Sequence, residues 1–204
     1  MAMATLCLLA VGTGSAYAGE GPWLVRLRAL DMNVDNENNI TPVTTAYGEV
    51  DVEDKWFPEI DISYFFTPNL AAELVLTYPQ KHDIRSGSTQ IGTLKHLPPT
   101  FSLQYHFTGM GFRPYVGAGL NLTHFSSVKF NPAVAAALDP SIKKTSVGFA
   151  YGAGFDVPMG EGWVFNVDAK KVQIGTDVKS KGTKVGEFKV DPDLFSIGIG
   201  KKFY

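Results

Sequence analysis

The chain has 204 residues, enough for one domain with a full core, and its net charge of -2 offers no basic surface for nucleic acid. Apolar residues make up 45% of it, yet after the first segment no apolar run approaches the roughly 20 residues that a membrane-spanning helix needs. With 21 glycines and 12% aromatic residues, the composition favours strands joined by tight turns.

Residues 1–18 are predicted to be a secretory signal peptide. An apolar stretch runs from Leu6 to Val11, and the segment ends in small residues that resemble an A-x-A cleavage site at Ala16 and Ala18. A short buried helix is the alternative interpretation. The only cysteine, Cys7, lies in this segment, so the predicted mature chain, residues 19–204, has no disulfide and no thiol chemistry.

The rest of the chain divides into alternating apolar and polar segments of strand length. They cover residues 22–34, 55–66, 70–81, 96–107, 112–125, 145–157, 162–174 and 189–203. The connections at 67–69, 108–111 and 158–161 are short, whereas those at 35–54, 82–95, 126–144 and 175–188 are long and polar. Strict alternation places all short turns at one end, as in outer-membrane barrels with short periplasmic turns and long extracellular loops.

The two faces of these strands differ in side-chain size. Phe101, Leu103 and Tyr105 share one face of their strand, and Ser102 and Gln104 share the other. The interior of an eight-stranded barrel is too narrow for eight strands of large side chains, so these must face outward into lipid. The pattern therefore predicts an all-β fold, an eight-stranded antiparallel transmembrane β-barrel, rather than a soluble lipocalin-like barrel.

Charged and polar side chains are expected inside this barrel, in its periplasmic half and near mid-depth. They are Arg26, Arg28, Asp61, Glu73, Gln104, His106, Arg113, Asp156 and Asp168. In a narrow lumen they should pair, because an unpaired buried charge is costly. The set predicts a structural polar plug in preference to a charge-lined ion path.

The outer half of the lumen is predicted to be apolar. Leu30, Met32 and Phe57 point inward there, and the loop from Phe130 to Leu138 is apolar as well. That loop should contain a short helix, with Asn131 as N-cap and Pro132 in the first position, ending at Asp139-Pro140. It either covers an apolar channel mouth or packs within its own loop.

An apolar solute that enters such a mouth gains nothing by passing the charges below it. It could leave sideways into lipid if the wall opened. Proline cannot donate a hydrogen bond to the ladder, and Pro79, Pro98 and Pro99 lie high on adjacent strands. They indicate a lateral seam, with prolines that merely mark strand ends as the alternative.

Several stretches resemble the OmpW family of outer-membrane proteins, which includes the AlkL hydrocarbon-uptake proteins. The matching stretches are 97–107, 113–121, 152–156, 163–168 and 191–200, with Leu97-Pro98-Pro99-Thr100 and Arg113-Pro114-Tyr115 the specific blocks. The resemblance implies a bacterial outer-membrane barrel with a narrow hydrophobic channel, passage of small hydrophobic molecules and lateral release into the membrane.

The C-terminal strand, with Phe195, Ile197, Ile199 and Phe203 on one face, resembles the assembly signal that the barrel-assembly machinery reads in this family. The chain departs from the family at three places. Lys201 replaces an aromatic residue and Tyr204 follows Phe203, Lys170-Lys171 stands where a basic-aromatic pair is common, and the loops do not align.

Other chemistry finds little support in the sequence. The four histidines, at 82, 96, 106 and 124, lack metal-ligand spacing, and no Gly-x-Ser-x-Gly nucleophile motif occurs, so no metal and no cofactor is expected. Three function classes remain: a passive channel for small hydrophobic solutes, a plugged structural or adhesive surface barrel, and an outer-membrane lipase or acyltransferase. The expected partners are outer-membrane lipid, small hydrophobic solutes and the barrel-assembly machinery.

Overall fold

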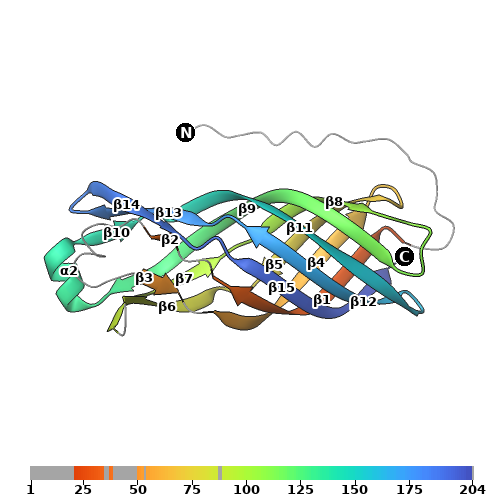
Figure 1. Ribbon diagram of the computed structural model, residues 1–204, viewed down its shortest axis with the longest axis horizontal. Coiled ribbons are helices and arrows are strands. Elements are labelled where there is room, and N and C mark those ends of the chain that lie inside the picture. Colours follow the sequence, from red (N-terminus) through yellow and green to blue (C-terminus); the bar gives the residue numbers. More distant parts are fainter. Residues whose placement is uncertain (1–20, 35–36, 39–49, 53, 87–88, 204) are drawn as a thin grey trace.

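The computed structural model describes residues 21–34, 37–38, 50–52, 54–86 and 89–203, and the predicted signal peptide lies outside these residues. They form a closed antiparallel barrel (Figure 1). Its wall strands are β1 (Trp23–Asn33), β4 (Lys55–Phe65), β5 (Leu70–Thr77), β8 (Thr100–His106), β9 (Arg113–Phe130), β11 (Thr145–Gly160), β12 (Trp163–Val172) and β15 (Asp193–Phe203). The predicted eight-stranded antiparallel barrel is confirmed.

Each wall strand pairs with the next one along the chain, and the last strand closes the ring on the first. The ladder between β1 and β15 runs without interruption from the pair Trp23–Phe203 to the pair Asn33–Asp193. A closed ring has no free strand edge, which is a requirement for sheet in lipid because every backbone group must find a partner within the protein.

The short connections lie at the end of the barrel that also holds the C-terminus (Figure 1). The amide of Asn69 joins two of them, because its Nδ2 donates to the backbone oxygen of His106 at 2.8 Å and to the hydroxyl of Thr108 at 3.2 Å. The third turns at Glu161 and Gly162, whose φ angles of 50° and 75° are left-handed, as a two-residue hairpin requires.

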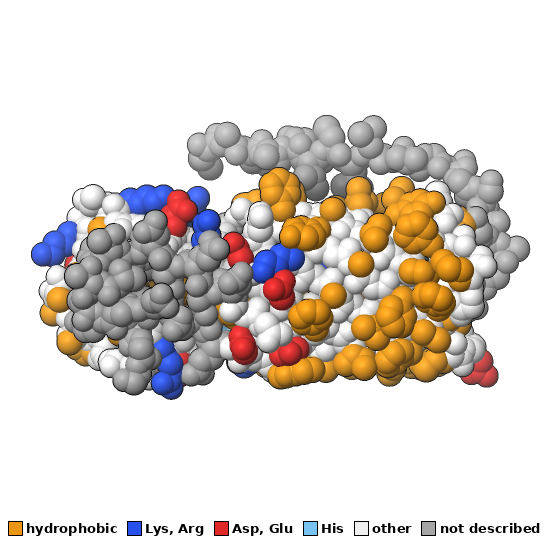
Figure 2. Space-filling view, viewed as in Figure 1, with side chains coloured by type: hydrophobic (Ala, Val, Ile, Leu, Met, Phe, Trp, Pro, Cys, Tyr) orange, Lys and Arg blue, Asp and Glu red, His pale blue; other side chains and the backbone are white. Residues whose placement is uncertain are grey.

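The outside of the barrel is apolar. Phe149 is 66% exposed and Leu120 is 52% exposed, and similar large side chains surround the wall (Figure 2). Such a continuous apolar band is far larger than a protein surface in water carries, but it matches the hydrocarbon layer of a membrane. The polar side chains of the same strands face inward, so the arrangement is that of a membrane barrel and not of a soluble one.

The structure corrects the prediction for the long connections. Residues 82–95, 126–144 and 175–188 are not irregular loops, and the predicted strands 70–81 and 96–107 each divide at their prolines. The elements involved are β2 (Glu37–Asn38), β3 (Val50–Val52), β6 (Gln80–Ser86), β7 (Thr89–Leu97), β10 (Pro140–Ile142), β13 (Gly175–Ser180) and β14 (Thr183–Lys189).

These elements extend the barrel beyond the apolar band. The hairpin β6–β7 joins β9, and β13–β14 forms a second sheet with β10 and β2. Their inner faces enclose an apolar cluster that includes Ile84, Ile91, Phe125, Val178 and Phe188. We call these elements the extracellular extension. Burial of the cluster stabilises strands whose own sequences are too short and too polar to predict.

The predicted short helix is confirmed as α2 (Pro132–Leu138). Its N-cap residue acts differently from the expectation: the side chain of Asn131 makes no capping bond and instead donates to the backbone oxygen of Gln90 at 3.2 Å. The helix ends at Asp139, whose φ of 41° is left-handed. Within the described part of the chain, no helix is long and apolar enough to cross a membrane.

Candidate functional site

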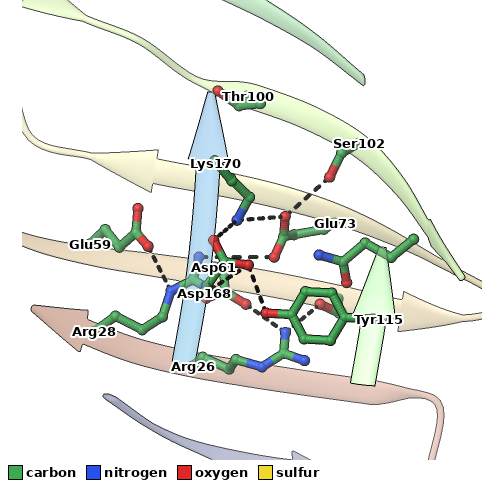
Figure 3. Close-up of polar contacts among 12 residues, drawn as sticks. Arg26, Arg28, Glu59, Asp61, Glu73, Thr100, Ser102, Tyr115, Asp168 and Lys170 are labelled. Atoms are coloured by element: carbon green, nitrogen blue, oxygen red, sulfur yellow. Dashed lines mark hydrogen bonds and ion pairs between the residues drawn. The ribbon is translucent and has the colours of Figure 1, made fainter. Parts of the chain in front are cut away.

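Two arginines on β1 form the centre of a polar network inside the barrel. Arg26 and Arg28 are two residues apart, so both point into the lumen, and both are fully buried. Carboxylates from β4, β5, β11 and β12 converge on them, as Figure 3 shows for several of these residues. We call this network the plug.

Arg26 binds the carboxylates on its two sides. Its Nε and Nη2 donate to the two oxygens of Asp156 at 3.0 and 2.6 Å, which is a bidentate pair. Its Nη1 donates to Asp61 at 2.9 Å and to Ser63 at 2.9 Å. The guanidinium thus ties β1 to β4 and, across the lumen, to β11.

Arg28 lies among four carboxylates. Its Nε is 2.6 Å from Glu59 and 3.0 Å from Asp61, and its Nη atoms are 3.9 Å from Glu73 and 3.7 Å from Asp168. A fixed, planar fork of donors suits this position better than a lysine would, because it can address several oxygens in different directions.

A third cation, Lys170, completes the plug from β12. Its Nζ is 2.8 Å from Asp168 and 3.2 Å from Glu73. The hydroxyl of Tyr115 donates to Asp168 at 2.7 Å, and that of Ser102 donates to Glu73 at 3.0 Å. The plug predicted from the sequence lacks four of these residues: Lys170, Tyr115, Glu59 and Ser102. Two of them could have been found from the sequence. Lys170 lies two residues after Asp168, and Tyr115 lies two residues after Arg113, so each shares a strand face with a residue that was predicted to point into the lumen.

The plug is unbalanced in charge. Five carboxylates, those of Glu59, Asp61, Glu73, Asp156 and Asp168, surround the three cations Arg26, Arg28 and Lys170. It is also densely packed: a cavity beside Tyr115 and Lys170 measures only about 10 Å³, roughly the room that one water molecule needs. The plug therefore leaves little open space at this depth of the lumen.

Two residues that were predicted for the plug, Gln104 and Arg113, contact side chains outside the network around Arg26 and Arg28. Gln104 lies 3.1 Å from the Nε2 of His106, and the guanidinium of Arg113 lies 5.7 Å from the centre of the Phe65 ring. Both lie towards the end of the barrel that carries the short turns, below the carboxylate cluster.

Above the plug, the lumen becomes apolar. Leu30, Met32 and Phe57 form one buried cluster, and they line a cavity of about 30 Å³ whose floor includes Glu59 and Lys170. We call this the mouth cavity.

The structure separates the other two predicted mouth residues from this group. Phe130 and Leu138 pack against the apolar cluster of the extracellular extension, where Phe130 also lines a second cavity of about 50 Å³. Val34 and Leu194 pack against both clusters. The two apolar clusters are thereby in contact, although the two cavities share no lining residue.

The wall beside the mouth cavity is interrupted. The ladder of β5 and β8 ends at Val75 and Thr100, and pairing resumes where β6 meets β7, at Gln80 and His96. Pro98 lines the mouth cavity at this gap. The gap holds all the predicted seam residues, Pro79, Pro98 and Pro99. We call it the proline break.

The side of the break next to β9 is fastened. The amide of Asn121 donates to the hydroxyl of Thr100 at 2.9 Å and lies 3.2 Å from the backbone oxygen of Pro98. The backbone of Leu122 donates to the oxygen of Pro99 at 3.0 Å. Any widening of the wall is therefore easier on the side of β5 and β6.

An apolar band around an eight-stranded barrel with a polar interior defines a bacterial outer-membrane β-barrel protein. The chain belongs to the OmpW family, whose model matches residues 19–203. Among its relatives, an uncharacterised outer-membrane protein y4mB of Sinorhizobium fredii is 36% identical over 96% of this chain and 86% of its own. Outer membrane protein W of Vibrio cholerae is 32% identical over 98% of this chain and 99% of its own.

Solved structures agree on the fold. The crystal structure of the outer membrane protein OprG from Pseudomonas aeruginosa superposes with a TM-score of 0.75, covering 91% of this chain and 97% of that one at 24% identity. The predicted family and the outer-membrane location are confirmed.

Proposed function

We propose that this protein is a passive channel for small hydrophobic molecules, which enter through the extracellular extension and leave sideways through the proline break. The observation that carries the proposal is that one cavity connects the apolar mouth with the interrupted wall: Met32 and Phe57 line it together with Pro98. The surrounding lipid accepts the solute after release.

The plug supports a sideways path. An apolar molecule in the mouth cavity faces Glu59 and Lys170 below it. Contact with these ion-paired groups gives an apolar molecule no favourable free energy. Movement down the lumen would also require the ion pairs of Arg26 and Arg28 to separate, which is costly for buried charges. The plug thus blocks the lower lumen, and the lipid beside the proline break is the nearest apolar phase.

The size of the mouth cavity indicates how passage occurs. A volume of about 30 Å³ holds little more than a water molecule or two, so an alkane passes only when the wall widens. The proline break is the place where widening disrupts fewest ladder hydrogen bonds, because proline nitrogens donate none.

The test replaces Pro79 and Pro98 by threonine, which restores a backbone donor and favours strand. In cells whose outer membrane carries this barrel as the added channel, we expect uptake of n-octane to fall several-fold in the double variant. Pro114→Thr is the matched control, because Pro114 lies in the wall at the opposite end of β9 and should leave uptake unchanged.

Two results would contradict the proposal. If the double variant is folded and takes up n-octane at the wild-type rate, the proline break is not the exit. If the wild-type barrel itself does not speed uptake over cells without it, the protein is a plugged structural or adhesive barrel. Measuring heat-modifiability on gels for each variant separates lost transport from lost folding.

A further inference from the structure

The mouth cavity contains polar atoms with no hydrogen-bond partner. Among the described residues, the hydroxyl of Thr77 and the Nε2 of His96 are both buried without a partner, and both residues line the cavity. His96 is only 5% exposed. Atoms of Glu59 and Lys170, which line the same cavity, also lack a hydrogen bond, but they lie in ion pairs at 2.6 and 2.8 Å. Buried polar groups are nearly always paired, so the two neutral orphans, Thr77 and His96, indicate a group that binds there.

A third orphan lies next to them. Gln80, which is fully buried, pairs with His96 across the β6–β7 ladder, and its Oε1 has no hydrogen-bond partner in the described structure. Its amide nitrogen is used, because it donates to the backbone oxygen of Tyr78 at 3.0 Å. The polar patch is therefore a small set of donors and acceptors at the edge of the proline break.

The imidazole of His96 is uncharged. Burial, the ring of His82 stacked at 4.7 Å, and the charge of Lys55 lower the pKa of His96 to about 3. A neutral imidazole nitrogen either donates or accepts according to its tautomer, so it can serve a hydroxyl or a carbonyl group. It offers no positive charge to a carboxylate.

The floor of the mouth cavity also disfavours anions. Lys170 is the cation there, and Asp168 and Glu73 already hold it at 2.8 and 3.2 Å. With five carboxylates against three cations in the plug, an added negative head group would meet net repulsion.

From these contacts we infer that the preferred solute is an apolar chain carrying one neutral hydrogen-bonding head group, such as a primary alcohol, an aldehyde or an ester, and that Thr77 and His96 bind this head group. The inference rests on the proposed channel function. The head group matches the small volume of the mouth cavity, and the chain lies against Leu30, Met32 and Phe57 or extends through the proline break.

The experiment compares probes of equal chain length, n-octane, 1-octanol and octanoate, in whole-cell uptake by the full-length barrel. We expect His96→Leu and Thr77→Val each to slow 1-octanol uptake about fivefold, which is the size of one hydrogen bond's net contribution. Because a hydrocarbon makes no such bond, each variant should lower the ratio of 1-octanol uptake to n-octane uptake by this factor. His96→Gln, which keeps a donor and an acceptor, should restore most of the rate.

Tyr105→Phe is the matched control, because it removes a hydroxyl from the lipid-facing side of the wall, where Tyr105 is exposed. A second readout uses imidazole nitrogen NMR of the barrel in lipid bilayers: addition of 1-octanol should shift the His96 resonance. A purely structural role for His96 would not produce this shift.

The outcomes distinguish this inference from the proposed function. If neither n-octane nor 1-octanol crosses faster with the wild-type barrel than without it, the channel function itself fails. If both cross faster, but His96→Leu slows them equally, the channel stands and the head-group site is wrong. Faster uptake of octanoate than of 1-octanol would also overturn the inference and point to Lys170 as the contact.

Discussion

Replacing Arg26 by leucine is the sharpest test of the plug as a structural element. The guanidinium is fully buried and donates four hydrogen bonds, two to Asp156, one to Asp61 and one to Ser63. Leucine fills part of the volume but leaves two buried carboxylates without this partner. Removing one member of a buried ion pair costs about 3–5 kcal/mol, so the free energy of unfolding should fall by that amount.

The assay is reversible urea unfolding of the barrel in lipid vesicles, followed by tryptophan fluorescence. Arg26→Lys keeps the charge but loses the bidentate fork, so it should cost less, about 1–2 kcal/mol. The double variant with Asp156→Asn should be less destabilised than the sum of the single variants, because the two side chains share one interaction. A loss below about 1 kcal/mol in Arg26→Leu would refute the claim that buried ion pairs hold the strands together across the lumen.

Further predictions concern close packing and assembly. A Cβ atom at Gly154 would lie 2.5 Å from the hydroxyl of Tyr115, so Gly154→Ala should displace that ring from the plug and lower the free energy of unfolding by about 1–3 kcal/mol in the same assay. Gly111→Ala, where a Cβ meets nothing within 4 Å, should be nearly neutral, and equal losses at both sites would contradict the packing argument. Deleting residues 203–204, the aromatic end of the chain, should lower the amount of folded, heat-modifiable barrel in outer membranes; normal amounts would show that this end has little weight in assembly.

The wall of the barrel could be predicted from the sequence because its signal is local. In strands such as β8 and β15, side chains alternate between lipid and lumen over consecutive residues, and a lipid solvent demands the large apolar set outside. The short turns carry equally local signals, as at Gly162, because glycine readily takes the left-handed φ of 75° that this two-residue turn requires. Neither depends on knowing which strand lies opposite.

The extracellular extension and the proline break could not be predicted from the alternation of apolar and polar side chains alone. The sequence placed Pro79 and Pro98 high on adjacent strands, but it could not show that the wall pairing stops there and that a separate hairpin, β6–β7, takes over. That hairpin is stable because its apolar face meets side chains from distant elements, among them Val178 and Phe188. A short strand that is buried by distant elements shows no periodic hydrophobic pattern in its own sequence.

The sequence by itself determined which side chains face the lumen, including Arg26 and Asp156. Only the tertiary structure decided which of them meet, since the pair is 130 residues apart and joins across the barrel. The tertiary structure also places Lys170 in the plug. In the sequence, Lys170 stood out only as a departure from the family. The physical reason is that contacts across a closed barrel depend on the register of all eight ladders at once, whereas the direction in which a side chain points depends only on its place along one strand.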